Sequence, residues 1–251
     1  MIIPESSSDS SEGVVPGSPQ HPHNIPGRVD LLLREFGRVG WLFQDKHVLD
    51  IGCADGRITC RIAEEFFIST IRGIDLDADN IEHAISNIVR PGARQIYFCR
   101  EDYIPQNEAE LNAEFETEYN TILCLAVTRS LHLRGGDEGL KLCFRKMYKQ
   151  LKFGGTLILE PNPFSTYDRV RRRHLRMYPH LDFRRYLESI GFRHYSTLRT
   201  YYYPSLTLYV KRPLDTVPIP QKTIKTPTSK KRRKKTKTPS PRKTPIKCLR
   251  F

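Results

Sequence analysis

The sequence has 251 residues and a formal net charge of +13 at pH 7, a length that allows one large domain or a medium-sized domain with tails. It contains no apolar run long enough to cross a bilayer and no basic leader followed by an apolar stretch, so we expect an intracellular protein. Its six cysteines form no C-x-x-C pair, which favours reduced thiols over a metal site or disulfides.

The charge divides the chain into a body and two tails. Of the 41 Lys and Arg residues, 15 lie between Lys211 and Phe251, together with only one of the 28 acidic residues, so the rest is close to neutral. Residues 213–251 are basic and rich in proline, and residues 1–24 are rich in serine and proline. Both compositions predict disorder, which leaves one domain at residues 25–212.

Within this domain, short apolar runs alternate with amphipathic patterns. Strands are predicted at residues 47–52, 69–77, 95–102, 120–127 and 155–161. Apolar residues three and four apart predict helices at residues 57–66, 78–88 and 139–151, the last ended by K-F-G-G. This alternation predicts an α/β fold with a mostly parallel sheet and helices on both faces. Ligands of such sheets bind at the carboxyl ends of the strands.

The loop D-I-G-C-A-D-G, residues 50–56, follows the first predicted strand. Gly52 and Gly56 let the backbone approach a ligand that a Cβ would exclude. The loop lacks the G-x-G-x-x-G pattern that cradles a pyrophosphate, and it is acidic. Asp75, at the end of the second strand, offers the carboxylate that pairs with two adjacent ribose hydroxyls. Asp75 therefore disfavours the alternative of a turn that binds nothing, and the loop indicates a cationic nucleoside without phosphate, which describes S-adenosylmethionine.

The end of the third strand, R-E-D-Y, adds polar groups to the same edge of the sheet. Asp102 can accept a hydrogen bond from an adenine amino group, and Tyr103 can pack against the ring. Alone, this stretch would be interpreted as a solvated strand end. Its position beside the loop gives it weight.

After the fifth predicted strand, arginines and aromatic residues are interleaved. Arginine binds phosphate and stacks on bases, and aromatic side chains add stacking surfaces. A merely solvated helix face would carry more acids than the two present, Asp168 and Asp182. We expect RNA binding here, with these residues as candidates: Arg169, Arg171, Arg172, Arg173 and Arg176.

Several segments together resemble one family. V-L-D-I-G-C-A-D-G, G-I-D-L-D, the long segment from Leu123 to Tyr167 and Y-L-E-S-I-G-F are similar to the methylphosphate capping enzymes, RNA methyltransferases that methylate a 5′-terminal phosphate. The resemblance runs from about Pro26 to Arg212, and T-R-x-x-H-L-x-x-G-D-x-G-L at residues 128–140 is its specific motif.

The resemblance implies a seven-stranded class I methyltransferase (Rossmann-like) fold, with S-adenosylmethionine as the methyl donor. It implies as acceptor a small non-coding RNA, of the 7SK type, the U6 type, or a small transfer or precursor RNA. It also implies a cofactor site in which Leu125 lies beneath the cofactor and Arg28 lies near its methionine end. The other residues expected to bind the cofactor are Asp50, Gly52, Cys53, Ala54, Gly56, Asp75, Leu76, Asp102 and Tyr103.

The reaction of this family needs few catalytic groups. A terminal phosphate oxygen is anionic at neutral pH, so its attack on a sulfonium methyl group needs positioning and a dry site more than a general base. Cations that orient the phosphates are needed, and arginine suits this role. Arg129 and His132 follow the fourth strand and are the candidate catalytic residues. Without the family motif, a solvated arginine and a hydrogen-bonded histidine would be the commoner interpretation.

Two departures from the family fall on the acceptor side of the site. Residues 14–24 lack the tyrosines of the family's N-terminal motif, and Ser130 replaces an aromatic residue. Three hypotheses therefore stand: an RNA 5′-phosphate methyltransferase, a catalytically inactive RNA-binding scaffold with the same fold, and a small-molecule methyltransferase. The arginines and the basic tail disfavour the third.

The C-terminal tail contains two candidate targeting motifs. K-K-R-R-K-K at residues 230–235 is typical of nuclear localisation, so we expect a nuclear protein, with a cytoplasmic location as the alternative. The final C-L-R-F has the form of a prenylation motif after a polybasic stretch. Because Arg250 suits this motif poorly, we expect no membrane anchor at Cys248. The sequence identifies no protein partner.

Overall fold

The computed structural model describes residues 28–86, 95–112, 119–169, 171–179, 181–198 and 205–212. All of them fall within the unit Met1–Thr216. The tails predicted at residues 1–24 and 213–251, with the localisation and prenylation motifs of the second, lie outside the described residues.

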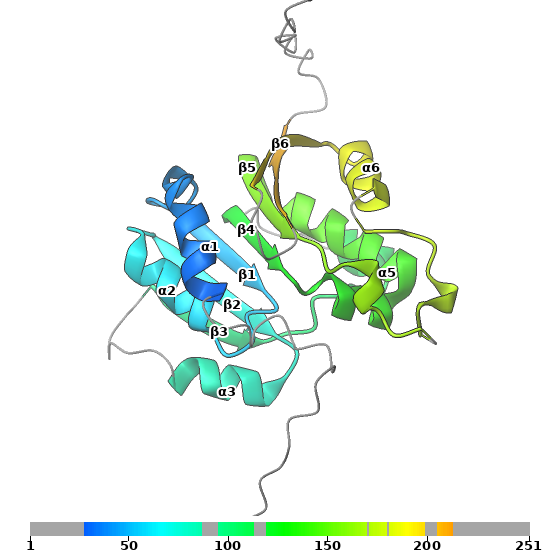
Figure 1. Ribbon diagram of the computed structural model, residues 1–251, viewed down its shortest axis with the longest axis horizontal. Helices are drawn as coiled ribbons and strands as arrows, with labels where there is room; N and C mark the ends of the chain where they lie inside the picture. The colour runs from blue at the N-terminus through cyan, green and yellow to red at the C-terminus, as the bar shows by residue number, and fades with distance from the viewer. Residues whose placement is uncertain are drawn as a thin grey trace, which may run out of the picture. The chain divides into compact units, whose positions relative to one another are not determined.

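The centre of the fold is a seven-stranded sheet with the order β3-β2-β1-β4-β5-β7-β6 (Figure 1). All strand pairs are parallel except those of β7, which runs antiparallel to both β5 and β6. The strands are β1 His47–Ile51, β2 Thr70–Asp75, β3 Ile96–Arg100, β4 Tyr119–Leu125, β5 Leu151–Glu160, β6 Phe192–Leu198 and β7 Leu206–Lys211. The predicted α/β fold with a mostly parallel sheet is therefore confirmed.

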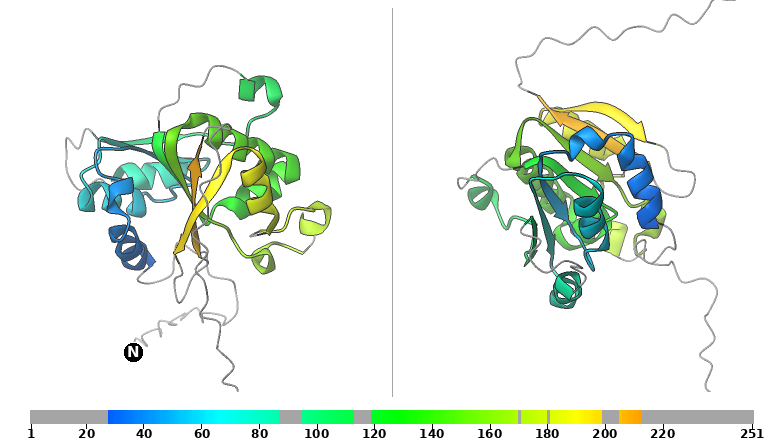
Figure 2. Two further views of the ribbon diagram at one scale, coloured as in Figure 1. Left: turned by 90° about the horizontal axis from the view of Figure 1, so that it is seen from above. Right: turned by 90° about the vertical axis from the view of Figure 1, so that its left-hand side faces the viewer.

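Helices cover both faces of this sheet. The α-helices are α1 Arg28–Gly37, α2 Arg57–Glu65, α3 Ala78–Ser86, α4 Glu108–Asn112, α5 Thr128–Gln150 and α6 Leu181–Ser189. Short 3₁₀ helices are η2 Gly40–Leu42, η3 Phe164–Thr166 and η4 Arg171–His174. Figures 1 and 2 show α1 and α2 on one face, and α5 and α6 on the other.

Each face has its own hydrophobic core, because successive strand residues point to opposite sides. Leu157 and Leu159 of β5 pack with Phe144 of α5, whereas Ile158 between them packs with Phe36 of α1. All five side chains are at most 1% exposed. Burying a side chain of this size contributes about 1.5–3 kcal/mol, so the two cores hold the strand ends in fixed relative positions.

The helix predicted at residues 139–151 starts earlier, at Thr128. Gly136 has φ 63° and ψ −170°, so α5 consists of two helical stretches joined at a kink. The Gly-Gly pair resembles a loop in the sequence, which is why only the second stretch was predicted. The following strand also starts earlier, at Leu151, and includes the K-F-G-G stretch with Gly154 at φ +76°.

Candidate functional site

A cavity of about 570 Å³ lies at the carboxyl ends of β1, β2 and β4. Cofactor sites typically occupy ~300–1,000 Å³. The strand order reverses between β1 and β4, and in open α/β sheets this reversal is where ligands bind. Its lining includes residues from the carboxyl ends of β1, β2 and β3 and from α5, which follows β4: Gly52, Ala54, Asp75, Glu101, Tyr103, Arg129 and Arg134.

The loop after β1 has a backbone that other residues would adopt only with strain. Gly52 and Gly56 both have φ +72°, and Ala54 has φ +49°. A Cβ on Gly52 would lie 2.5 Å from Cγ2 of Val127. The amides of Gly52 and Cys53 donate to the carbonyl of Ile74 at 2.8 and 3.0 Å, which ties the loop to the end of β2. Both the close approach and the left-handed backbone explain the glycine at position 52.

Asp75 fixes this loop and faces the cavity. Its Oδ2 accepts the amide of Ala54 at 3.0 Å, and its Oδ1 accepts the amide of Asp77 at 3.0 Å. Oδ1 also accepts Nδ2 of Asn80 at 3.4 Å, so of the about four acceptor positions of a carboxylate one remains for a hydroxyl of a ligand. Leu76, the next residue, also lines the cavity.

Six residues expected at the cofactor lie outside the cavity lining: Asp50, Cys53, Gly56 and Leu125, and also Arg28 and Asp102, which are described below. Asp50 is 3% exposed and accepts the hydroxyl of Thr59 at 2.6 Å, which joins β1 to the first turn of α2. Burial raises the pKa of Asp50 from 3.8 to about 6; the Thr59 hydrogen bond lowers it and the charge of Asp75 raises it. From this position Asp50 supports the loop after β1 and does not face the cavity.

The end of β3 presents Glu101 and Tyr103 to the cavity, while Asp102 lies outside its lining. Asp102 forms an ion pair with Arg134 and accepts the amide of Ile104 at 3.1 Å. Burial alone would raise the pKa of Asp102, but the hydrogen bonds from Arg134 and Ile104 outweigh it and hold this pKa below its ordinary value. Glu101 thus occupies the position that the sequence favoured for Asp102.

Tyr103 is held from two directions. Its hydroxyl donates to Oε1 of Gln150 at 2.8 Å, and Nζ of Lys146 lies 4.4 Å from the ring centroid. Lys146 also donates to Glu101 at 3.0 Å, as does Arg72. The tyrosine ring and the neighbouring carboxylate are therefore positioned by one network beneath the cavity.

Arg28, expected near the methionine end, is buried at the start of α1 and outside the cavity lining. Its guanidinium forms a bidentate pair with Glu160, with Nη1–Oε1 at 2.9 Å and Nη2–Oε2 at 2.5 Å. Glu160 ends β5 and pairs in register with Leu125 of β4. Such a geometry offsets part of the desolvation of two buried charges.

Of the two candidate catalytic residues, Arg129 lines the cavity and His132 does not. The amide of Arg129 donates to Oδ1 of Asn162 at 2.9 Å, and its Nη1 donates to the carbonyl of Thr166 at 3.3 Å. His132 is fully buried, and its Nε2 bonds to Oδ1 of Asp137 at 2.7 Å. Burial lowers the pKa of His132, against the effect of Asp137, so the imidazole is neutral at pH 7.

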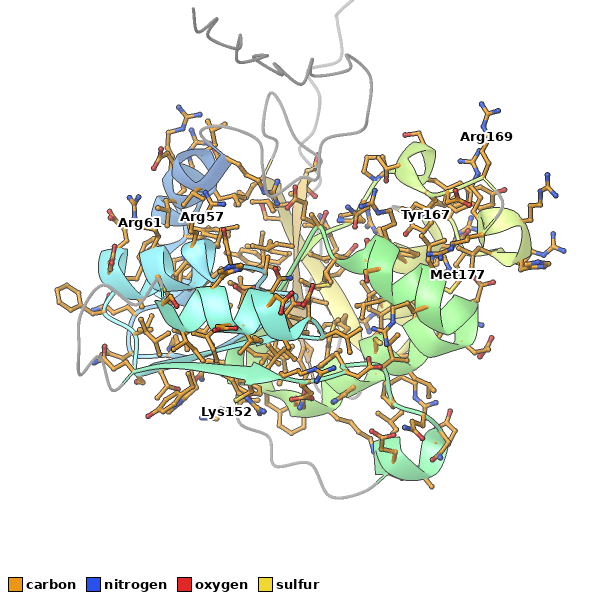
Figure 3. All side chains as sticks on the ribbon, turned by 90° about the horizontal axis from the view of Figure 1, so that it is seen from below. Arg57, Arg61, Lys152, Tyr167, Arg169 and Met177 are labelled. Carbon is orange, nitrogen blue, oxygen red and sulfur yellow. The ribbon has the colours of Figure 1, made fainter. Side chains whose placement is uncertain are left out.

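The candidate RNA-binding arginines follow β5 on irregular backbone. Arg169, Arg171, Arg173 and Arg176 are exposed, and Figure 3 shows Arg169 extending away from the ribbon. Arg172 is half-buried, because its Nη1 donates to the carbonyl of Phe164 at 2.9 Å and its guanidinium lies 5.2 Å from that ring. The exposed four can reach an external anion without first breaking a buried contact.

Sequence reasoning missed several lining residues. Arg134 lies near Ser130 and Arg129 on one face of α5, and the helical period would have indicated it had the first stretch of the helix been predicted. Ala126 has φ +54° and no sequence signal marks it. Glu101 is one residue from the acid that was chosen.

In the part of the chain that the structure describes, no three His, Cys, Asp or Glu side chains are grouped to hold a metal ion. None of the described helices is long and apolar enough to cross a membrane.

Two family profiles match the chain. The profile described as Bicoid-interacting protein 3 (Bin3) matches residues 119–216, from β4 through β7. A profile described as a methyltransferase domain matches residues 48–155, from β1 into β5. Together they cover both the loop after β1 and the segment that bears Arg129.

Known proteins agree with these profiles. The U6 snRNA methylphosphate capping enzyme Amus of Drosophila melanogaster is 37% identical over 151 residues, covering 57% of this chain and 50% of that protein. The human 7SK snRNA methylphosphate capping enzyme is 28% identical over 206 residues, covering 59% of this chain and 29% of that protein. The chain thus spans half or less of the length of these two relatives.

Among solved structures, the N-methyltransferase NodS from Bradyrhizobium japonicum in complex with S-adenosyl-L-homocysteine has a TM-score of 0.57. The similarity covers 77% of this chain and 91% of that one at 16% identity, so it concerns the fold alone. The fold is the class I methyltransferase fold with its seven-stranded sheet. The profile match over residues 119–216 and the relatives named as capping enzymes agree with the motif at residues 128–140: the chain is similar to the methylphosphate capping enzymes.

Proposed function

We propose that this protein is an RNA methyltransferase that transfers the methyl group of S-adenosylmethionine to the 5′-terminal phosphate of a small non-coding RNA. The observation that carries the proposal is the composition of one cavity, which joins the loop Gly52–Ala54 and Asp75 to Arg129. The loop and Asp75 suit a nucleoside, and Arg129 lies in the segment matched by the Bin3 profile. The relatives named as U6 and 7SK capping enzymes support the substrate class.

The residues present fit S-adenosylmethionine. Asp75 has acceptor capacity left for a ribose hydroxyl and could accept a second in place of the long 3.4 Å contact from Asn80. Tyr103 offers a ring held by Gln150. The acidic loop and the carboxylates of Asp75 and Glu101 suit the positive sulfonium, and a dinucleotide pattern of glycines that would cradle phosphate is absent from the loop. Bound there, this cofactor supplies an electrophilic methyl group. Glu101 and Asp75 favour its positive charge by simple Coulomb attraction.

Positioning of the RNA end is the task that remains for the protein. Arg129 lines the cavity, and its guanidinium donates to the carbonyl of Thr166 at 3.3 Å, a hydrogen bond that a phosphate can displace. Arg134 lines the same cavity but is paired with Asp102. In the transfer, a phosphate oxygen forms the new O–C bond as the C–S bond breaks, and S-adenosylhomocysteine leaves. No proton moves, so no general base is required.

We assign His132 a supporting role in place of the catalytic one suggested by the sequence. It is fully buried, neutral, and bonded to Asp137. A neutral buried imidazole cannot offer a charge to a phosphate in the cavity. The arginines at positions 169, 171, 173 and 176 extend the basic surface along which the RNA body would lie.

We further propose that the protein acts in the nucleus, directed by residues 230–235. A fluorescent reporter fused to residues 211–251 tests this, with a variant carrying Ala at all six positions 230–235 as the matched control. Nuclear signal that the control loses supports the proposal. Diffuse cytoplasmic signal contradicts it, as does membrane signal that Cys248→Ser abolishes.

The activity is tested by incubating the full chain with S-adenosylmethionine labelled in its methyl group and total small RNA. We expect label in a discrete RNA band, removable with the 5′ phosphate, and none with Asp75→Ala. Cofactor binding without any transfer to RNA would favour the inactive RNA-binding scaffold. Transfer to small molecules of a cell extract, with RNA unlabelled, would favour the third hypothesis.

A further inference from the structure

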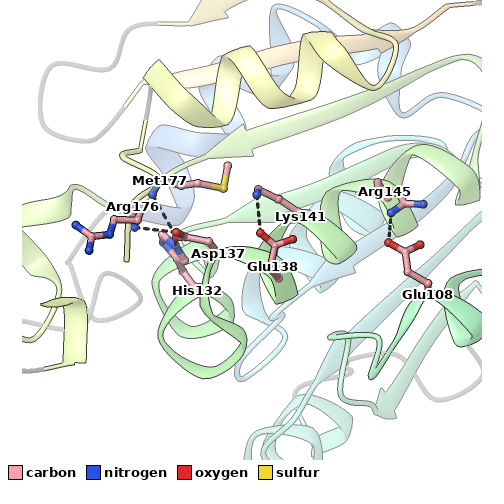
Figure 4. Close-up of polar contacts among 8 residues, drawn as sticks. All are labelled: Glu108, His132, Asp137, Glu138, Lys141, Arg145, Arg176 and Met177. Carbon is pink, nitrogen blue, oxygen red and sulfur yellow. Dashed lines mark hydrogen bonds and ion pairs between the residues drawn. The ribbon is translucent and has the colours of Figure 1, made fainter. Parts of the chain in front are cut away.

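Asp137 forms a junction between α5 and the arginine segment, defined here as residues 171–177. Its Oδ1 accepts Nε2–H of His132 at 2.7 Å and the amide of Met177 at 3.2 Å. Its Oδ2 accepts the amide of Arg176 at 2.8 Å. Figure 4 shows these contacts meeting at one carboxylate. Both oxygens are therefore used to hold a segment that is about forty residues away in the sequence.

The position of Asp137 follows from the kink in α5. Gly136, with φ 63°, separates the stretch that starts at Thr128 from the one that ends at Gln150, and Asp137 is the first residue after it. This kink turns the carboxylate towards the arginine segment. Only glycine adopts such a backbone without strain, which accounts for the G-D pair in the motif.

The first stretch of α5 connects this junction to the cavity. Arg129, Ser130 and Arg134 on one of its faces line the cavity. His132 points to the other side, where its ring meets Tyr167 at 5.6 Å and Phe183 at 5.7 Å between centroids. Within one turn of α5, Arg129 therefore lines the cavity and His132 bonds Asp137.

We infer that Asp137 is a positioning residue that holds the arginine segment in register with the cavity, and that His132 acts through it. This inference rests on the proposed function, in which the arginine segment carries RNA. Because Asp137 bonds the main-chain amide of Arg176, the side chain of that arginine stays exposed and available to phosphate. The carboxylate of Asp137 thus fixes the backbone of the arginine segment without forming an ion pair with the guanidinium of Arg176.

The charges at the junction agree with this role. Burial would raise the pKa of Asp137, but the hydrogen bonds from His132 and from the two amides outweigh it and keep this pKa below its ordinary value. The carboxylate is then ionised at neutral pH and accepts all three bonds. His132, whose pKa is lowered by burial, donates from Nε2 as a neutral group.

The next residue, Glu138, provides a matched control. It has the same charge, but its side chain is 82% exposed and pairs with Lys141 at 2.6 Å (Figure 4). Neither Glu138 nor Lys141 bonds the arginine segment in any contact drawn in Figure 4. Glu138→Ala should therefore leave both RNA and cofactor binding as in wild type.

The first arm of the test is hydrogen exchange of the full chain, which needs no ligand. In Asp137→Ala we expect the amides of Arg176 and Met177 to exchange at least about tenfold faster, the equivalent of ~1.4 kcal/mol of lost protection. Asp137→Asn keeps one carbonyl acceptor and should be intermediate. Unchanged exchange in Asp137→Ala would overturn the inference whether or not the protein binds RNA.

The second arm compares affinities for a short 5′-phosphorylated RNA and for S-adenosylmethionine. Asp137→Ala should bind the RNA about tenfold more weakly and bind the cofactor within about twofold of wild type. In turnover, KM for RNA should rise with KM for cofactor unchanged, and Asp137→Asn should recover part of the loss. Cofactor affinity that falls as far as RNA affinity would indicate general destabilisation and contradict a positioning role.

The two arms separate this inference from the proposed function. If wild-type protein binds no RNA, the proposed function fails, and the exchange arm still decides whether Asp137 holds the segment. If exchange accelerates while RNA affinity stays at the wild-type value, the segment is held by Asp137 but does not position RNA. That result overturns the inference and leaves methyl transfer intact.

Discussion

Replacing Asp50 by Asn tests the electrostatics at the base of the cavity. The carboxyl is 3% exposed, and burial raises its pKa from 3.8 to about 6. A raised pKa means that the folded state holds a proton that the unfolded state releases. Stability is therefore unaffected by this group below about pH 4, falls as pH rises from about 4 to 6, and stays lowered above that range.

The size of the effect follows from the shift. About two pKa units at 1.36 kcal/mol each give roughly 3 kcal/mol lost above about pH 6. Asn has nearly the same shape, can still accept the hydroxyl of Thr59, and carries no charge. The stability gain of Asp50→Asn over wild type should then grow by about 3 kcal/mol between about pH 4 and pH 8.

Urea denaturation followed by circular dichroism, at several pH values between these limits, measures this gain. Asp79→Asn is the matched control, because Asp79 is exposed in the first turn of α3, and its effect should stay below about 1 kcal/mol throughout. A gain for Asp50→Asn that does not change with pH would refute the reasoning. So would a loss of stability at pH 8, which would mean that the folded site favours the charge.

Three further substitutions test other parts of the site. Asp75→Ala removes charged acceptors worth ~1.5–3 kcal/mol each, so cofactor affinity measured by calorimetry should fall at least about a hundredfold; unchanged affinity would disprove the site. Gly52→Ala places a Cβ 2.5 Å from Val127 at φ +72° and should lower the free energy of unfolding by ~2–5 kcal/mol, whereas a loss under about 1 kcal/mol in urea denaturation would show that the loop can relax. Replacing Arg171 and Arg173 together by Ala should reduce the salt slope of RNA binding by about 1.4 with cofactor affinity unchanged; a slope equal to wild type would remove these residues from the RNA surface.

The parts of the fold that could be predicted are those with a strong local pattern. The first two strands are short and rich in β-branched and other apolar residues, and the loop between Asp50 and Gly56 has glycines wherever the backbone needs positive φ, apart from Ala54. Their carboxyl ends must share one edge of a parallel sheet. Gly52 and Asp75 therefore could be placed together from the sequence, and in the structure they line one cavity.

The parts that could not be predicted depend on tertiary contacts. The choice between Glu101 and Asp102 is made by Arg134, which draws Asp102 away, and by Lys146 and Arg72, which hold Glu101. Nothing in the order of residues indicates these partners. The helical first stretch of α5 was hidden for a related reason, since its kink at a glycine pair has the local signature of a loop.

The role of His132 shows the same limit. The motif at residues 128–140 places an arginine and a histidine three positions apart, which suggests two cations acting together. In the structure Arg129 lines the cavity, whereas packing against Tyr167 and Phe183 turns the histidine inward. The burial that lowers the pKa of His132 comes from residues distant in the sequence, so its neutral state could not be read from the motif.

The central claim is that the cavity joins a methyl donor to the terminal phosphate of RNA. One small nuclear RNA transcript, prepared with a 5′-phosphate or with a 5′-hydroxyl end and otherwise identical, tests it most directly in a methyl-transfer assay with labelled S-adenosylmethionine. We predict transfer to the phosphorylated RNA only, at a rate reduced at least about a hundredfold by Asp75→Ala at subsaturating cofactor. Equal labelling of both RNAs, or labelling that survives removal of the 5′ phosphate, would contradict the account.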